Sequence, residues 1–158
     1  MRIKVPRCLA VFLLLVGIVS TSVRGAEDLF NGTWKLNPDK SSYKSAAPKS
    51  TTITIKIENG IETYTSEVED ASGKNISTSF TAKLDGTDAP IAGNSYGDTI
   101  SVKQQLPKSL VATITKDRKV VMKVHFDVSA DGKKLSAYYS GNDADGNGVH
   151  GLLFYDKQ

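Results

Sequence analysis

Apolar and polar residues alternate with a period of two through most of the chain after residue 50. In the stretch TTITIKIE, residues 51–58, three isoleucines share one face, and threonine and lysine side chains occupy the other. Alternation of this kind is typical of antiparallel strands that have one buried and one solvated face. The pattern predicts eight or nine strands, near 30–36, 51–58, 61–69, 75–84, 98–105, 109–116, 119–128, 134–140 and 149–156.

Turn residues separate the predicted strands. Asn59-Gly60 is a two-residue hairpin signal, and Asp85-Gly86 and Asp131-Gly132 mark further turns. A ribbon of consecutive hairpins with one apolar face can bury that face by closing on itself, which also removes the sheet edges. We therefore predict an all-β fold, an antiparallel up-and-down β-barrel of 8–9 strands, with a two-sheet sandwich as the alternative.

Two segments break the alternation. Residues 37–50 contain two prolines among serine and lysine residues, and residues 88–98 contain a proline and two glycines. Both are predicted to be long loops, the first over one end of the barrel, and binding functions often lie in such loops. The alternative is that they only connect and cap the strands.

The first 25 residues have the pattern of a secretory signal peptide. Three basic residues precede an apolar run of about a dozen residues, which is too short to span a bilayer comfortably. We expect residues 26–158 to form a single lipocalin-like barrel domain of a secreted or periplasmic protein. Cys8 is the only cysteine, so this domain would fold without disulfide bonds.

The charge balance argues against a nucleic-acid partner. Four of the 20 basic residues lie within residues 1–25, whereas all 17 acidic residues follow them. The predicted domain therefore carries one more acidic than basic residue, and no basic stripe remains to neutralise phosphates.

The stretch FNGTWKL, residues 30–36, resembles the first strand of lipocalins and fatty-acid-binding proteins, the calycin group, and Tyr155-Asp156-Lys157 extends this likeness. The chain resembles a lipocalin-like (calycin-type) small secreted β-barrel protein. The resemblance implies that Trp34 plugs the narrow end of the barrel and that Gly32 allows the backbone to approach closely. It also implies that Lys157 lies over the indole.

The chain departs from this group in two places. Fatty-acid-binding proteins follow the first strand with a pair of helices, for which residues 37–50 are too short and poorly patterned. They also bind a carboxylate with an Arg-x-Tyr pair on the last strand. Here Tyr155 matches the tyrosine, but Leu153 stands in the position of the arginine. Leucine cannot pair with a carboxylate, so the resemblance does not extend to that manner of fatty-acid binding.

Motifs for catalysis or metal binding are weak. Residues 142–148 resemble the first half of an EF-hand loop, but Phe154 occupies the position of its bidentate glutamate. His125 and His150 have no third metal ligand at a diagnostic spacing. We predict no enzymatic activity, no cofactor and no metal site.

The predicted inner face is largely apolar and suits a small hydrophobic ligand. The candidate ligand-binding residues are Ile55, Phe80, Val102, Ile114, Met122, Val124, Phe126, Tyr139 and Tyr155. Polar groups near the strand ends come from Tyr64, Tyr96, Tyr138 and Tyr139. The first hypothesis is a secreted protein that binds or carries a small hydrophobic molecule. The alternative is a filled β-barrel that acts as a protein-interaction or inhibitor module without a small-molecule ligand.

Overall fold

The computed structural model describes residues 29–44, 47–143 and 146–158, so the predicted signal peptide lies outside the described residues. Leu29 and Phe30 are helical, and a short 3-10 helix, η1, covers Pro38–Lys40. The strands are β1 (Gly32–Leu36), β2 (Ser42–Tyr43), β3 (Ser50–Glu58), β4 (Ile61–Glu69), β5 (Asn75–Lys83), β6 (Asp85–Ala92), β7 (Thr99–Leu106), β8 (Ser109–Lys116), β9 (Lys119–Val128), β10 (Lys134–Asn142) and β11 (Gly148–Lys157).

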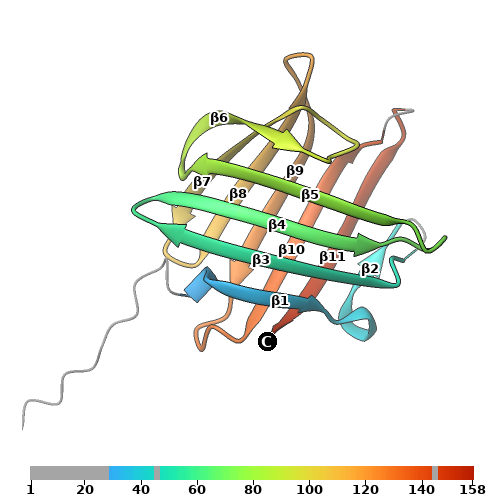
Figure 1. Ribbon diagram of the computed structural model, residues 1–158, viewed down its shortest axis with the longest axis horizontal. Helices are drawn as coiled ribbons and strands as arrows, with labels where there is room; N and C mark the ends of the chain where they lie inside the picture. The colour runs from blue at the N-terminus through green and yellow to red at the C-terminus, as the bar shows by residue number, and fades with distance from the viewer. Residues whose placement is uncertain (1–28, 45–46, 144–145) are drawn as a thin grey trace, which may run out of the picture.

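The strands form one antiparallel sheet that closes into a barrel. From β3 to β11 each strand pairs with the next in sequence, and β1 pairs with both β3 and β11 (Figure 1). Trp34 of β1 lies opposite Lys157 of β11, which completes the ring. The two-residue β2 pairs with β11 farther along the same edge, at Gly151 and Leu152. The all-β antiparallel barrel is therefore confirmed, but it has ten strands rather than eight or nine.

The strand missing from the prediction is β6, because residues 88–98 were expected to form a loop. The side chains of β6 are mostly exposed, so no apolar alternation marks it in the sequence. Its pairing with β5 is limited to Ser79 opposite Ala92 and Phe80 opposite Ile91, and its register with β7 shifts between Asp85 and Asp88. β6 is a strand because its backbone pairs with β5 and β7. The sequence pattern of its own side chains does not indicate this pairing.

The hairpin of β8 and β9 corrects a second expectation. The alternation puts Val120 on the inner face, but this side chain is 56% exposed. The register between β8 and β9 shifts between Ile114 and Thr115, so the regular inward and outward order is lost near the tip. The tip itself projects beyond the barrel wall (Figure 1).

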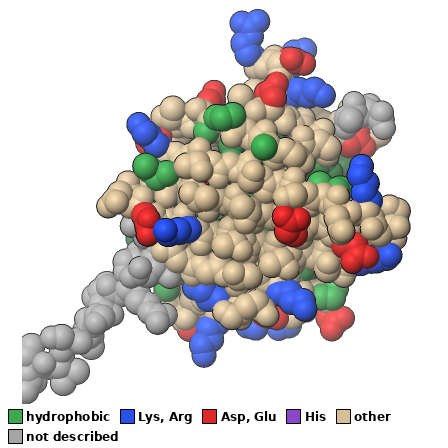
Figure 2. All heavy atoms as spheres, in the orientation of Figure 1, with side chains coloured by type: hydrophobic (Ala, Val, Ile, Leu, Met, Phe, Trp, Pro, Cys, Tyr) green, Lys and Arg blue, Asp and Glu red, His purple; other side chains and the backbone are tan. Residues whose placement is uncertain are grey.

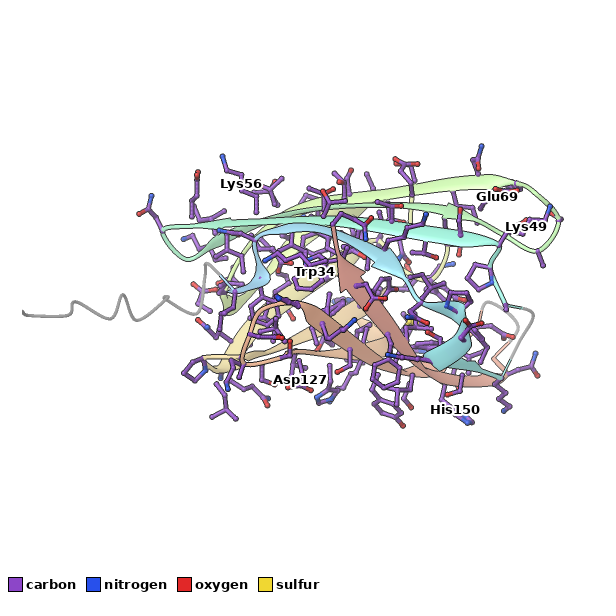
Figure 3. All side chains as sticks on the ribbon, turned by 90° about the horizontal axis from the view of Figure 1, so that it is seen from below. Trp34, Lys49, Lys56, Glu69, Asp127 and His150 are labelled. Atoms are coloured by element: carbon purple, nitrogen blue, oxygen red, sulfur yellow. The ribbon has the colours of Figure 1, made fainter. Side chains whose placement is uncertain are left out.

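The buried core follows the predicted alternation where that pattern is strongest. Ile53, Ile55 and Ile57 of β3 are each 2% exposed, and Phe30, Trp34 and Leu135 are fully buried. Figure 3 shows Trp34 between the two walls of the barrel, whereas Lys56 and Asp127 point outward. The core thus fills the end of the barrel that lies next to β1.

The outer face visible in Figure 2 carries lysine, arginine and acidic side chains that are interspersed rather than gathered by sign. Among the described residues, no helix is long and apolar enough to cross a membrane.

Candidate functional site

One end of the barrel is sealed by the tryptophan that the sequence singles out. The indole N–H of Trp34 donates a 2.9 Å hydrogen bond to the carbonyl of Phe30. The ammonium nitrogen of Lys157 lies 4.8 Å from the centre of the indole ring and donates to the carbonyl of Leu29 at 3.1 Å. The cation–π contact joins β11 to β1. The two hydrogen bonds join these strands to Leu29 and Phe30, the helical residues that precede β1.

Gly32 makes room for this arrangement. Its φ is +138°, and a Cβ at this position would stand 2.7 Å from Cε of Lys157. The three residues to which a structural role was assigned, Gly32, Trp34 and Lys157, therefore lie together. The lysine stem passes over the glycine to reach the indole.

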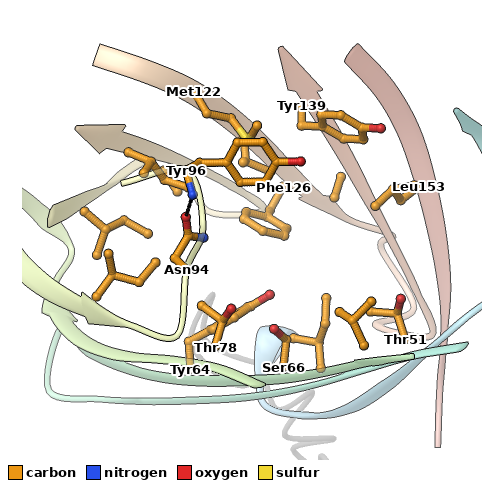
Figure 4. A pocket seen from close by; sticks show the side chains of 18 of the residues that line it. Thr51, Tyr64, Ser66, Thr78, Asn94, Tyr96, Met122, Phe126, Tyr139 and Leu153 are labelled. Atoms are coloured by element: carbon orange, nitrogen blue, oxygen red, sulfur yellow. Dashed lines mark hydrogen bonds between the residues drawn. The ribbon is translucent and has the colours of Figure 1, made fainter. Parts of the chain in front are cut away.

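Toward the other end the barrel interior contains a cavity of about 360 Å³ that reaches the surface (Figure 4). Its apolar wall includes Phe80, Ile114, Met122, Phe126 and Leu153. Small-molecule pockets in proteins span roughly 300–1,000 Å³, so the cavity can hold a ligand of modest size.

Most of the candidate ligand-binding residues surround this cavity. The seven that line it are Phe80, Ile114, Met122, Val124, Phe126, Tyr139 and Tyr155. The other two, Ile55 and Val102, are 2% and 1% exposed and lie in the packed core instead. Ile55 is opposite Gly32, beside the Trp34 plug, and is therefore too deep in the barrel to reach the cavity.

Much of the polar part of the cavity wall comes from residues that the sequence pattern does not single out. Tyr43, Thr51, Ser66, Thr78 and Asn94 all line it. For Ser66 a signal exists, because it shares the inward parity of Tyr64 on β4. Tyr43 belongs to a two-residue strand in a segment expected to be a loop, so no periodic pattern could have located it.

The four tyrosines expected to offer polar groups divide into two sets. Tyr64, Tyr96 and Tyr139 line the cavity. Tyr138 does not, because its side chain is 47% exposed on the outer face, where its ring lies 6.4 Å from that of His125. Alternation along β10 requires this outcome, since two adjacent tyrosines cannot both point inward.

Burial raises the pKa of three of the tyrosines that line the cavity. Tyr64 stacks on Phe80 with ring centres 4.8 Å apart, and burial raises the pKa of its hydroxyl to about 12. Burial also raises the pKa of Tyr155 well above its ordinary value, and that of Tyr139 in the same direction. These phenols therefore act as hydrogen-bond donors and acceptors at neutral pH and carry no charge.

Asn94 shapes the loop between β6 and β7 at the cavity wall. Its side-chain oxygen accepts hydrogen bonds from the backbone N–H groups of Tyr96, at 2.8 Å, and Gly97, at 3.1 Å (Figure 4). This Asx-type turn directs Tyr96 toward the cavity. The segment predicted as a loop thus contains the end of β6 and contributes three residues to the cavity wall, Ile91, Asn94 and Tyr96.

The cavity wall contains no basic residue among the residues that the structure describes. Leu153, in the position where fatty-acid-binding proteins have an arginine, lines the cavity as an apolar residue. Asp70 is the acidic residue of the wall, and its Oδ1 accepts hydrogen bonds from the backbone N–H groups of Ser72 and Lys74. Asp70 also accepts a hydrogen bond from the Ser72 hydroxyl. This hydrogen bond lowers the pKa of Asp70 most, and the backbone hydrogen bonds lower it further.

A buried carboxyl group lies deeper in the barrel. Glu62 of β4 is only 3% exposed, and it sits between Ile57 of β3 and Ala82 of β5 in the sheet register. In the described part of the chain its Oε2 has no hydrogen-bond partner. Burial raises the pKa of Glu62 to about 7. The sequence analysis missed this group, although it shares the inward parity of Tyr64.

The segment resembling a calcium loop forms a turn between β10 and β11, of which residues 144 and 145 lie outside the described residues. The Asp143 carboxylate accepts hydrogen bonds from the backbone N–H and the side-chain amide of Asn147. Among the described residues no group of three acidic, histidine or cysteine side chains could hold a metal ion.

No family model matches this sequence, and no curated protein matches it. The structure is similar to zebrafish ileal bile acid-binding protein complexed with cholic acid, with a TM-score of 0.51 and 15% sequence identity. The match covers 82% of this chain and 99% of that one. The fold is that of a calycin-type barrel.

This calycin-type barrel is more weakly similar to the siderocalin Ex-FABP, a protein with dual ligand specificities. The TM-score is 0.39 and the identity 11%, over 82% of this chain and 74% of that one. At 15% identity the comparison with the zebrafish protein establishes the fold alone, and the calycin-type resemblance predicted from residues 30–36 is confirmed at that level.

Proposed function

We propose that this calycin-type barrel is an exported protein that binds one small, largely apolar molecule in the cavity. The observation that carries the proposal is the cavity of about 360 Å³ itself, lined by aromatic and aliphatic side chains and by neutral hydroxyl groups. Each methylene that a ligand buries there contributes about 0.8 kcal/mol, before the cost of association. The zebrafish protein, which has a similar fold, was solved in complex with cholic acid, and this supports binding of a small molecule by the present chain.

The cavity weighs against the alternative of a filled barrel that acts as a protein-interaction or inhibitor module. In a filled barrel the side chains occupy the interior. Here the inner wall includes the small residues Ala112 and Ala137, and a cavity of about 360 Å³ remains beside them. Export rests on the pattern of residues 1–25 and would be checked by locating the mature chain and sequencing its first residues.

Filling the cavity should abolish binding. In Ala137→Phe, a phenyl ring enters the cavity from β10, and we expect the affinity for a neutral fluorescent probe such as N-phenyl-1-naphthylamine to fall by more than about tenfold. Fluorescence titration measures this effect. The matched control is Ala130→Phe, which adds the same ring at an exposed position outside the cavity.

Circular dichroism and thermal unfolding should show that both variants remain folded. Equal probe affinity in the two folded variants would contradict binding in the cavity. If only Ala137→Phe loses the probe, the natural ligand can be sought by native mass spectrometry of the protein from its own host. A mass that is lost on mild organic extraction would identify it.

A further inference from the structure

The polar groups around the cavity suggest which chemical class of ligand it takes. Five tyrosines line the wall, Tyr43, Tyr64, Tyr96, Tyr139 and Tyr155, together with hydroxyl and amide side chains. All of these groups are neutral hydrogen-bond donors and acceptors. No lysine, arginine or histidine accompanies them within the described residues.

One of these groups is left without a partner. The hydroxyl oxygen of Tyr43 is buried, and among the described residues it makes no hydrogen bond. Buried hydroxyl groups are nearly always paired with protein or with ordered water, because an unpaired one loses its hydration without compensation. Because Tyr43 also lines the cavity, a turn of its side chain toward the cavity would let a bound molecule supply the missing hydrogen bond.

The fold holds Tyr43 in this position for a reason that can be traced. Tyr43 pairs with Gly151 of β11, where a Cβ would come within 2.6 Å of the hydroxyl of Tyr139. Gly151 thus allows β2 and the Tyr139 side chain to pack against the same point of β11. Two phenol groups, from β2 and β10, are brought to one side of the cavity.

An anionic ligand would find no counter-charge among the described lining residues, and a cationic one would find only Asp70. A carboxylate that enters loses its hydration and meets no cation among the described lining residues, which makes its burial unfavourable. An ammonium group would meet only Asp70, whose Oδ1 already accepts hydrogen bonds from three groups of residues 72–74. An uncharged polar group avoids both penalties and can bond to the tyrosine hydroxyls.

We propose that the ligand is an uncharged amphiphile, whose hydroxyl or carbonyl group bonds to the hydroxyl of Tyr43 while its apolar body lies against Phe126 and Met122. This inference rests on the proposed function and specifies the ligand class of the same cavity. It differs from carboxylate recognition by an arginine on the last strand, which Leu153 makes impossible at that position.

The test compares three ten-carbon molecules that differ only in their polar group, namely decanol, decanoate and decylammonium. Each is used at neutral pH to displace N-phenyl-1-naphthylamine from the full-length mature protein. We expect decanol to displace the probe at a concentration at least about tenfold lower than either ion. Equal or stronger displacement by decanoate or by decylammonium would overturn the proposal.

A pair of variants tests the role of Tyr43. Tyr43→Phe should weaken decanol binding about fivefold while leaving the affinity for the naphthylamine probe within about twofold, which also shows that the cavity is intact. The control is Tyr138→Phe, which removes an identical hydroxyl from the outer face and should change neither affinity. Unchanged decanol binding in Tyr43→Phe would overturn the assignment. If the probe fails to bind the unmodified protein, the proposed function itself falls, and this inference with it.

Discussion

The contribution of Glu62 to the free energy of unfolding is expected to fall by about 3 kcal/mol as the pH rises from about 4.5 to about 7, because its carboxyl group is buried. Its pKa is 4.5 in its ordinary environment and about 7 in the folded barrel, where burial disfavours the charged form. Below pH 4.5 both the folded and the unfolded chain hold the proton, and the stabilising contribution is fully present. Between the two values only the folded chain holds it, so each rise in pH favours unfolding.

Glu62→Gln should remove this pH dependence, since the amide is similar in shape and does not titrate. We expect the variant to exceed the unmodified protein in stability above pH 7 and to approach it near pH 5. Urea unfolding monitored by circular dichroism at several pH values measures both curves. The surroundings are simple, because the sheet neighbours of Glu62 are Ile57 and Ala82, and Tyr64 remains neutral throughout this range.

The matched control is Glu67→Gln, which changes an exposed carboxyl on the outer face of the same strand. Its pH profile should follow that of the unmodified protein between pH 5 and 7. Coincident pH profiles for the Glu62 and Glu67 variants would contradict the role assigned to the buried group. Four aspartates of the described residues have lowered pKa values and titrate below this range, so they do not interfere, namely Asp70, Asp85, Asp131 and Asp156.

Trp34→Ala should lower the free energy of unfolding by about 3–5 kcal/mol, the range for removing a large aromatic residue from a core. Trp34 is fully buried, and its loss would leave a void at the sealed end and free the carbonyl of Phe30 from its hydrogen bond. It would also leave Lys157 without the ring beneath its ammonium group. Because Trp34 is the only tryptophan, unfolding must be followed by circular dichroism and not by tryptophan fluorescence.

Trp34→Phe separates the contributions to this loss. Phenylalanine keeps an aromatic ring under Lys157 but cannot donate to Phe30, so we expect a smaller loss, of about 1–2 kcal/mol. Losses of less than 1 kcal/mol in Trp34→Ala would show that the plug contributes little. In that case the β1–β11 pairing alone would hold the ring of strands closed.

The sequence was most informative where one face of a strand is uniformly buried. The three isoleucines of β3 made the inner face obvious, and Asn59-Gly60 has the positive φ values, 53° and 73°, of the turn that its residues predict. The plug was also predictable, because Gly32, Trp34 and Lys157 resemble a known arrangement at specific positions. These features depend on residues near one another or on a motif with few alternatives.

The sequence was least informative where position depends on distant partners. The strand β6 has no buried face of its own, and β2 exists only because β11 offers an edge at Gly151 and Leu152. Tyr43 and Glu62 are therefore the residues that sequence reasoning missed and that matter most to the proposals. Parity on β4 could have revealed Glu62, whereas nothing in the local pattern indicates Tyr43.

Closure of the barrel also has a consequence for how the protein is made. The final contact joins Trp34 to Lys157, so the ring cannot close until residue 157 has emerged from the ribosome. Until then, the growing sheet has two unpaired edges, which can associate with other chains. The chain therefore needs most protection from aggregation while β11 is not yet available to pair with β1, and delaying that pairing should increase aggregation.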